Sequence, residues 1–208
     1  CRRYVEEGYR VVGNARSQDK LEAMAAELGD AFTAVAGDAS RQATVDALFQ
    51  AARETYGGDA DCVVVNAGRG LGEALLEVDI ERFAQIQELN VTGALALMQA
   101  AAAAMTARQE KAFPEQAADI VVIGSVVGRH VSPFSAAYGA TKHAVHSLVE
   151  ALRREIGPKG VRVSLIEPGF VLSGFQEGAG YSDDVVAGIK EKFSPSLYGA
   201  DIADAIHY

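Results

Sequence analysis

Short apolar segments alternate with longer helical segments along this chain, and this alternation constrains its fold more than any other feature. The apolar segments run without polar interruption, as expected of strands whose two faces are both covered by helices. Their order predicts an α/β fold with a doubly wound parallel sheet, formed as one domain over residues 1–208. We expect strands at residues 10–14, 31–36, 62–65, 119–124 and 161–166, and helices at 17–29, 40–56, 79–107 and 133–157.

Capping residues predict where these helices begin. A serine or an aspartate precedes each helical segment, and Pro133 suits the first turn of the last one. The predicted caps are Ser17, Ser40, Asp79 and Ser132. We interpret residues 106–118, which include Pro114, as a solvent-exposed connection, and residues 169–181 as a lid-like segment that two short helices follow.

The charge and the cysteine content argue against several classes of function. A net charge of −9 does not suit a surface for nucleic acid or an anionic membrane, because either partner needs a basic patch. Cys1 and Cys62 form neither a disulfide framework nor a metal-binding spacing, so we expect no metal site and a reducing, cytoplasmic location. The alanine-rich stretch 94–107 has few large apolar residues, and we do not expect it to span a membrane.

Turns with polar or small residues follow three of the predicted strands directly. They contain Asn66, Ser125 and the pair Pro168-Gly169. In doubly wound sheets ligands bind beyond the carboxyl ends of the strands, so these turns belong to one edge of the sheet. The sequence therefore predicts a cofactor cleft at that edge.

The segment from Ser125 to Lys142 carries the residues with the clearest chemistry. Tyr138 and Lys142 are four residues apart in a predicted helix, so their side chains lie on one face, one turn apart. A phenol has an unperturbed pKa of about 10, and a nearby cation favours the phenolate, which can exchange a proton with an alcohol or a carbonyl. Ser125 could hold the oxygen of a substrate by a hydrogen bond. A Tyr-x-x-x-Lys pair alone is a weak signal, and the motifs that accompany it give it weight.

Together these motifs resemble those of the short-chain dehydrogenase/reductase family, over essentially the whole chain. The matching residues are Asn66-Ala67-Gly68, Asn90 in the sequence LNVTG, Ser125, Tyr138-x-x-x-Lys142 and Pro168-Gly169. The resemblance implies a single-domain Rossmann-like fold. It also implies an enzyme that interconverts a secondary alcohol and a ketone or aldehyde by hydride transfer with a nicotinamide cofactor.

The resemblance implies a role for each residue of the catalytic set. Tyr138 would be the general acid/base, and Ser125 would orient the substrate carbonyl. Lys142 would lower the pKa of Tyr138 and bind the nicotinamide ribose. The backbone carbonyl of Asn90 would hold a water molecule that links Lys142 to solvent, and the alternative for Asn90 is a buried side chain that bridges helix backbone groups.

The same resemblance implies a set of residues that bind the cofactor. They are Asn66, Ala67 and Gly68 at the adenosine ribose, Asp38 and Ala39 near the adenine, and Pro168, Gly169, Val171 and Ser173 at the nicotinamide carboxamide. A plain turn is the alternative for Asn66–Gly68. For Asp38 the alternative is an Asx turn that leads into the Ser40 cap.

The end of the strand at 10–14 indicates which nicotinamide cofactor is used. Relatives that prefer NAD have an acidic residue here, which binds the adenosine ribose hydroxyls. This chain has Ala15 followed by Arg16, and an arginine can pair with a 2′-phosphate. The sequence therefore predicts NADP, with NAD less favoured, and the alternative for Arg16 is a solvated loop arginine.

Two parts of the family pattern are not found in this sequence. The glycine-rich phosphate loop and the first strand are missing ahead of the segment CRRYVEEG, and the last strand is missing after DIADAIHY. A doubly wound sheet without its central strand would leave backbone groups unpaired. We therefore expect the protein to possess further segments at both ends.

The residues expected on the substrate side are mostly apolar or aromatic, which fits a small or medium-sized ketone, aldehyde or secondary alcohol. They are Ser125, Val127, His130, Phe134, Phe170 and Phe175, with Arg69 and Leu71 after the Asn66–Gly68 turn.

Other functions and a partner also have to be weighed. A catalytically silent NAD(P)-binding sensor or scaffold is the main alternative. An epimerase or dehydratase would need a substantial C-terminal substrate domain, and about forty residues follow Pro168. By resemblance we expect a homodimer or homotetramer that packs through helices 79–107 and 133–157, whose alanine-rich faces allow close approach. The alternative for these faces is packing on the chain's own sheet.

Overall fold

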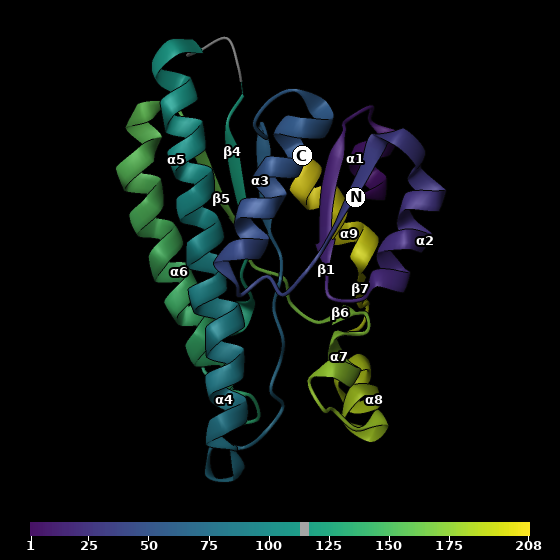
Figure 1. Cartoon of the computed structure of the whole chain (residues 1–208). Helices are drawn as coiled ribbons and strands as arrows, with labels where there is room; N and C mark the ends of the chain where they lie inside the picture. Colours follow the sequence, from purple (N-terminus) through teal and green to yellow (C-terminus); the bar gives the residue numbers. More distant parts are fainter. Residues whose placement is uncertain (113–116) are drawn as a thin grey trace.

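Parallel strands and the helices between them form the framework of the computed structural model, which describes residues 1–112 and 117–208 (Figure 1). Strand β1 pairs with β2, strand β4 pairs with β3 and β5 on its two sides, and the short strands β6 and β7 pair with each other. Every one of these pairings is parallel. The strands are β1 (Val11–Ala15), β2 (Phe32–Ala36), β3 (Cys62–Val65), β4 (Asp119–Ile123), β5 (Arg162–Ile166), β6 (Val171–Leu172) and β7 (Leu197–Tyr198).

Helices connect successive strands and cover them, as the alternating pattern predicts. The helices are α1 (Arg2–Glu6), α2 (Gln18–Leu28), α3 (Gln42–Tyr56), α4 (Ile80–Gln87), α5 (Ala94–Ala112), α6 (Ala136–Ile156), α7 (Phe175–Gly178), α8 (Asp183–Lys192) and α9 (Gly199–His207). Strands β1 and β2 both contact α2 and α3, whereas α5 packs on β3 and β4 and α6 packs on β5. Figure 1 shows α5 and α6 lying side by side. The prediction of a Rossmann-like α/β fold is confirmed.

The β1–β2 pair and the β3–β4–β5 sheet share no strand pairing among the described residues. Helices α1 and α9 contact each other beside β3. The phenol of Tyr4 in α1 lies 3.5 Å from the Cys62 sulfur of β3 and donates a hydrogen bond to the Ile206 carbonyl of α9 at 3.4 Å. The two ends of the described chain therefore meet close to the start of β3.

A hydrophobic core lies between the β3–β4–β5 sheet and helices α3, α5 and α6. Val45 of α3, Met98 and Met105 of α5, Ile120 of β4 and Val149 of α6 are all buried in it. Burying one side chain of this kind contributes about 1.5–3 kcal/mol. The core therefore fixes β4 and α6, which carry the residues predicted to be catalytic.

One long helical segment differs in detail from its prediction. Asp79 caps α4 as expected, because its carboxylate accepts a hydrogen bond from the Arg82 N–H at 2.8 Å. The segment Glu88–Gly93 is a π-helical turn, a feature that occurs frequently at functional sites. Helix α5 continues to Ala112, beyond the predicted end at residue 107. The predicted connection around Pro114 lies outside the described residues.

Two predicted caps are wrong. Helix α3 begins at Gln42 with Arg41 in the capping position, because Ser40 belongs to the preceding turn, in which its N–H donates to the Asp38 carboxylate at 2.9 Å. Helix α6 begins at Ala136 after Ser135. The predicted cap Ser132 lies in a turn before the helix, where its carbonyl accepts a hydrogen bond from the Ser135 N–H at 3.3 Å.

By length and composition alone, the helical segment Ile80–Lys111 could cross a membrane, with a mean hydropathy of 1.3 over its most apolar window. This differs from the expectation for the alanine-rich stretch 94–107. Core helices of globular proteins meet the same criteria, and α5 packs against α3, α6, β3 and β4. It therefore packs on the chain's own sheet and helices, with 33% of its most apolar window buried.

Candidate active site

The serine loop, residues 124–129, begins directly after β4. Ser125 is buried, with 9% of its surface exposed, and its hydroxyl accepts a hydrogen bond from the Val127 N–H at 3.4 Å. The loop is tied to the chain that follows β5, because the Gly124 N–H donates to the Ile166 carbonyl and the Val126 N–H donates to the Pro168 carbonyl. The predicted neighbours Ser125 and Pro168 therefore share one edge of the sheet.

Tyr138 and Lys142 lie one turn apart on the buried side of α6, as predicted. Their exposed fractions are 9% and 7%, and the Lys142 ammonium lies 5.8 Å from the centre of the Tyr138 ring. Leu71, Val127 and Phe175 pack around the phenol, and the Phe175 ring centre is 5.5 Å from that of Tyr138. Apolar side chains thus form an enclosure around the buried phenol.

Burial raises the pKa of Tyr138 to about 12, and a hydrogen bond with the Ser125 side chain partly opposes this rise. This differs from the expectation that Lys142 would lower the pKa of the phenol. The reason is the position of the ammonium, which donates a hydrogen bond to the Ile123 carbonyl at 2.7 Å. Near neutral pH the phenol is therefore protonated in this structure.

Burial also lowers the pKa of Lys142, to about 8. The ammonium is the form that desolvation disfavours, because the surrounding side chains cannot replace its water shell. At pH 7 Lys142 is therefore still a buried cation, but its pKa is close to the pH of the solution.

Asn90 connects the turn after β3 to α6. Its side chain accepts a hydrogen bond from the Arg69 N–H at 2.9 Å and donates to the Arg69 carbonyl at 2.9 Å and to the Thr141 hydroxyl at 3.1 Å. Thr141 in turn donates to the Tyr138 carbonyl at 2.7 Å. The alternative role considered for Asn90, a buried bridging side chain, describes these contacts, although the bridge runs to a loop and to α6.

Small residues allow the loops of this edge to approach one another closely. A Cβ atom added at Gly68 would lie 3.3 Å from the Asn90 side-chain oxygen. A Cβ added at Gly93, in the π-helical turn, would lie 2.9 Å from the Ala39 carbonyl oxygen. The turn after β3, the turn after β2 and the π-helical turn are therefore packed as one unit, with Asn66 and Ala67 exposed at its surface.

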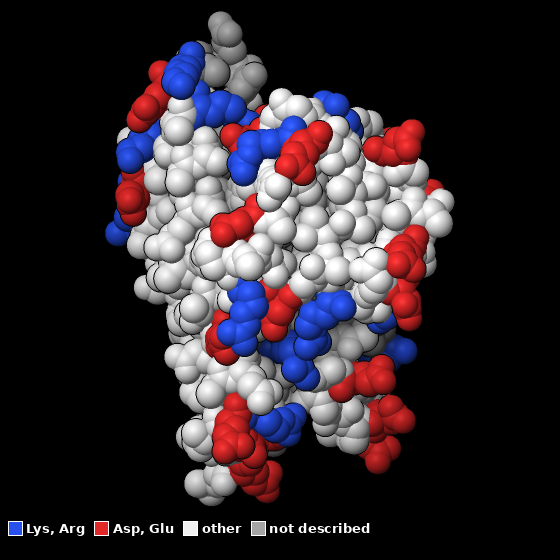
Figure 2. All heavy atoms as spheres, viewed as in Figure 1, with Lys and Arg blue, Asp and Glu red and all other residues white. Residues whose placement is uncertain are grey.

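Basic side chains lie at the ends of β1 and β2. Arg16 follows β1 directly and is exposed. Hydrogen bonds from Ser40 lower the pKa of Asp38, and the charges of Arg41 and Arg16 add to this effect. Figure 2 shows Lys and Arg side chains gathered near the middle of this face. Arg16 and Arg41 thus place positive charge beside Asp38 at the ends of β1 and β2, in a chain with a net charge of −9.

These residues fit a nicotinamide cofactor. Asn66 and Ala67 in the turn after β3 are exposed, and the exposed Arg16 can pair with an anionic group. Asp38 forms the Asx turn named as its alternative, and its second carboxylate oxygen can still accept a hydrogen bond. Among the described residues, no group of three or more His, Cys, Asp or Glu side chains could hold a metal ion.

The segment after β5 folds over the phenol. The Gln176 side chain donates to the Val171 carbonyl at 2.6 Å, and the Ser173 N–H donates to the Gln176 side-chain oxygen at 3.2 Å. The Gly72 N–H donates to the Ala179 carbonyl at 3.1 Å, which fastens the segment to the loop after β3. Phe175 of this segment, predicted as lid-like over residues 169–181, packs against Tyr138, and its role as a lid over a substrate stays a prediction.

Comparison with known proteins agrees with this geometry. Residues 1–182 match the family model described as short chain dehydrogenase. The chain belongs to the short-chain dehydrogenase/reductase family. An uncharacterized oxidoreductase of Staphylococcus aureus (strain N315) is 31% identical over 204 residues, a match that covers 98% of this chain and 80% of the relative.

Solved structures of short-chain dehydrogenases/reductases have the same fold. The 3-ketoacyl-(acyl-carrier-protein) reductase from Brucella melitensis, complexed with NADH, is 29% identical with a TM-score of 0.86 over 98% of this chain and 81% of that one. The closed form of serine dehydrogenase complexed with NADP⁺ is 26% identical with a TM-score of 0.87 over 99% and 80%. This short-chain dehydrogenase/reductase is therefore an NAD(P)-dependent oxidoreductase.

The structure of this short-chain dehydrogenase/reductase brings part of the predicted substrate side together. Leu71, Val127 and Phe175 pack around Tyr138. His130 is exposed and Phe134 is 74% exposed, so both lie at the outer surface, and Phe170 is half-buried. Neither His130 nor Phe134 belongs to the apolar cluster around Tyr138, so their place at the substrate side stays a prediction.

Sequence reasoning missed three residues of this site. Tyr181 packs against Gly72, and burial raises the pKa of its phenol. Thr141 links Asn90 to the backbone of Tyr138, and His146 lies below the serine loop. The sequence did contain a signal for His146, because residues 138, 142 and 146 are each four positions apart and so lie on one helix face.

Proposed function

We propose that this protein is an NADP-dependent oxidoreductase that interconverts an alcohol and the corresponding ketone or aldehyde. The observation that carries the proposal is the arrangement of Ser125, Tyr138 and Lys142, all buried at the carboxyl edge of the strands. A bound nicotinamide cofactor supplies or accepts the hydride. The residues of the chain hold the substrate carbonyl and transfer a proton to or from its oxygen.

The proposed roles follow from these positions. The Ser125 hydroxyl holds the substrate oxygen, and Tyr138 gives its proton to that oxygen as hydride arrives on carbon. Because burial raises the pKa of the phenol to about 12, Tyr138 is the proton donor near neutral pH. In this proposal the Lys142 ammonium, now 5.8 Å from the Tyr138 ring centre, turns from the Ile123 carbonyl to stabilise the phenolate left after proton transfer. Asn90 keeps the turn after β3 fixed against α6. The apolar side chains around the phenol favour a small or medium-sized carbonyl compound.

The alternative is a catalytically silent NAD(P)-binding sensor or scaffold. Titration of the protein with NADPH and NADH, followed by nicotinamide fluorescence, tests the cofactor. Loss of NADPH absorbance with a panel of ketones and aldehydes then tests the reaction. NADPH binding without turnover across the panel would overturn the catalytic proposal and favour the sensor.

The two free cysteines agree with the cytoplasmic location that we also propose.

Arg16 is proposed to select NADPH by pairing with the 2′-phosphate. Arg16→Ala should raise the Kd of NADPH by about 10- to 100-fold, because it removes a charge-assisted hydrogen-bonding group. The Kd of NADH should change by about twofold or less. Arg10→Ala is the matched control, since Arg10 precedes β1 at its opposite end and lies over the Tyr56 ring. Equal changes for both cofactors would show that Arg16 does not bind the phosphate.

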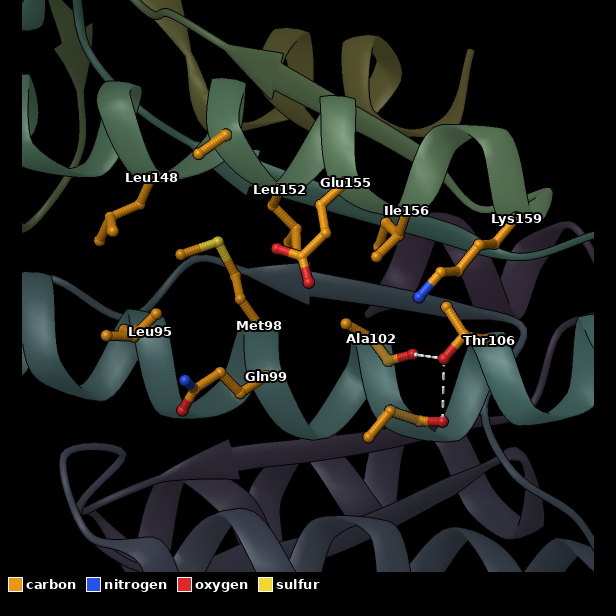
Figure 3. A pocket seen from close by; sticks show the side chains of 12 residues that line it. Leu95, Met98, Gln99, Ala102, Thr106, Leu148, Leu152, Glu155, Ile156 and Lys159 are labelled. Carbon is orange, nitrogen blue, oxygen red and sulfur yellow. Dashed lines mark hydrogen bonds between the residues drawn. The ribbon is translucent and has the colours of Figure 1, made fainter.

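We further propose that the protein forms a homodimer or homotetramer through α5 and α6. The groove between these helices is lined mainly by apolar and small residues (Figure 3). Leu95 and Met98 of α5 lie opposite Leu148 and Leu152 of α6. An apolar groove on the outside of two long helices suits a second copy of the same helices across a two-fold axis.

A charged side chain in this groove should therefore lower the oligomeric mass. Ala151 is exposed and lines the groove, so Ala151→Arg places a bulky charged side chain in the proposed interface. Light scattering after size-exclusion chromatography should show a smaller assembly at equal concentration. Ala26→Arg, on the exposed face of α2, is the control and should leave the mass unchanged. An unchanged mass for Ala151→Arg would contradict this interface.

A further inference from the structure

His146 is a buried histidine that contacts the serine loop from below. It lies on α6 one turn beyond Lys142, and 8% of its surface is exposed. The Ser125 backbone N–H donates a hydrogen bond to its Nε2 atom at 3.3 Å. The imidazole is therefore hydrogen-bonded to the backbone of Ser125, whose hydroxyl is proposed to hold the substrate oxygen.

The serine loop is shaped around this imidazole. A Cβ atom added at Gly124 would overlap the His146 Nε2 atom, and one added at Gly128 would overlap three atoms of the same ring. Only glycine at positions 124 and 128 lets the loop backbone lie against the ring. Ser125 is thus held between two glycines that both contact His146.

The hydrogen bond requires a particular form of the histidine. Nε2 can accept from the Ser125 N–H only when it carries no proton, so the proton of the neutral ring must be on Nδ1. Nδ1 is buried and has no hydrogen-bond partner among the described residues. A second proton would place two donors, Nε2–H and the Ser125 N–H, against each other.

The charged groups around His146 come from three elements. Glu167 follows β5 and favours protonation, whereas Arg129 of the serine loop and Lys142 and His143 of α6 disfavour it. Glu167 and Arg129 form a paired salt bridge with two contacts of 2.6 Å, so their charges largely cancel. Burial is the largest influence, and it lowers the pKa of His146. The neutral form is therefore the one expected near pH 7.

We propose that His146 is a positioning residue that holds the Ser125 backbone through its unprotonated Nε2 atom, so that the Ser125 hydroxyl is set for the substrate oxygen. The proposal rests on the role of Ser125 in the proposed function. Tyr138, Lys142 and His146 then form one row on α6, in which the third member acts on the reaction through the serine loop. Protonation of His146 releases the loop and lowers turnover at acid pH.

The first test compares two replacements of similar size. His146→Gln keeps an acceptor near the Nε2 position, whereas His146→Met keeps the volume and removes the acceptor. We expect His146→Met to lower kcat by about 10- to 100-fold with the Kd of NADPH unchanged, since small misplacements at a reacting centre have effects of this size. His146→Gln should recover most of this loss, and the acid limb of the kcat profile should disappear. Equal losses in both variants would indicate packing alone and overturn the proposal.

The second test does not depend on turnover. Histidine labelled with ¹⁵N reports which ring nitrogen carries the proton, and the His146 signals are assigned by their absence in His146→Gln. We expect the Nδ1–H form near pH 7, a titration midpoint below about 6.5, and a shift of the Ser125 amide signal with the same midpoint. His143→Gln, an exposed neighbour on α6, is the control. A protonated Nε2 at pH 7 would overturn the proposal even in an active enzyme, whereas an inactive wild type with the expected tautomer would count against the proposed function alone.

Discussion

Replacing Tyr138 by phenylalanine should reduce turnover by about 10²- to 10⁴-fold while NADPH binding stays nearly unchanged, because general acid/base catalysis contributes in this range. The phenylalanine ring preserves the packing against Phe175, 5.5 Å away, so the enclosure should keep its shape. The change removes only the hydroxyl that gives a proton to the substrate oxygen. Absorbance at the nicotinamide band measures turnover, and fluorescence titration measures binding.

Tyr181→Phe is the matched control for this experiment. Tyr181 is half-buried on the same side of the site, and burial also raises the pKa of its phenol. We expect a small change in KM and a kcat close to that of the wild type. If Tyr138→Phe kept its turnover, or if both variants lost it equally, Tyr138 would not be the acid/base.

The parts of the fold that were predicted correctly depend on local patterns. Strands β1 to β5 are short apolar runs with helices on both faces, and such runs are recognisable without knowledge of their partners. Asp79 and Ser17 cap α4 and α2 because a side-chain oxygen needs only the N–H groups of the next turn. The predictions that Ser40 and Ser132 cap helices were wrong, because each serine belongs to a turn that precedes the helix.

The candidate site shows where sequence patterns reach their limit. The spacing of Tyr138 and Lys142 predicts that they share a face, and they do. It does not predict that the Lys142 ammonium turns to the Ile123 carbonyl, because this depends on where β4 ends in space. The position of Tyr181 depends on contacts with Gly72, about a hundred residues earlier in the chain. Long-range packing therefore determined the features that were missed.

Lys142→Met should abolish most of the activity and, at the same time, stabilise the cofactor-free protein at pH 7. The folded pKa of about 8 is below the ordinary value of 10.5, so between these values the unfolded chain binds more protons than the folded protein. Stability therefore rises as pH increases from about 8 to 10.5, and at pH 7 the wild type bears the full penalty. A pKa difference of this size corresponds to about 3 kcal/mol of unfolding free energy.

Methionine keeps the length of the side chain without its charge, and the Ile123 carbonyl loses a donor at a cost of about 1 kcal/mol. We therefore expect the free energy of unfolding at pH 7 to rise by about 1–2 kcal/mol in urea titrations. The rise of stability between pH 8 and 10.5 should be weaker in the variant, and Lys20→Met, at an exposed position of α2, should change neither quantity. If the variant were less stable than the wild type at pH 7, the prediction would be contradicted. The interactions of the Lys142 charge would then stabilise the folded protein by more than its burial destabilises it.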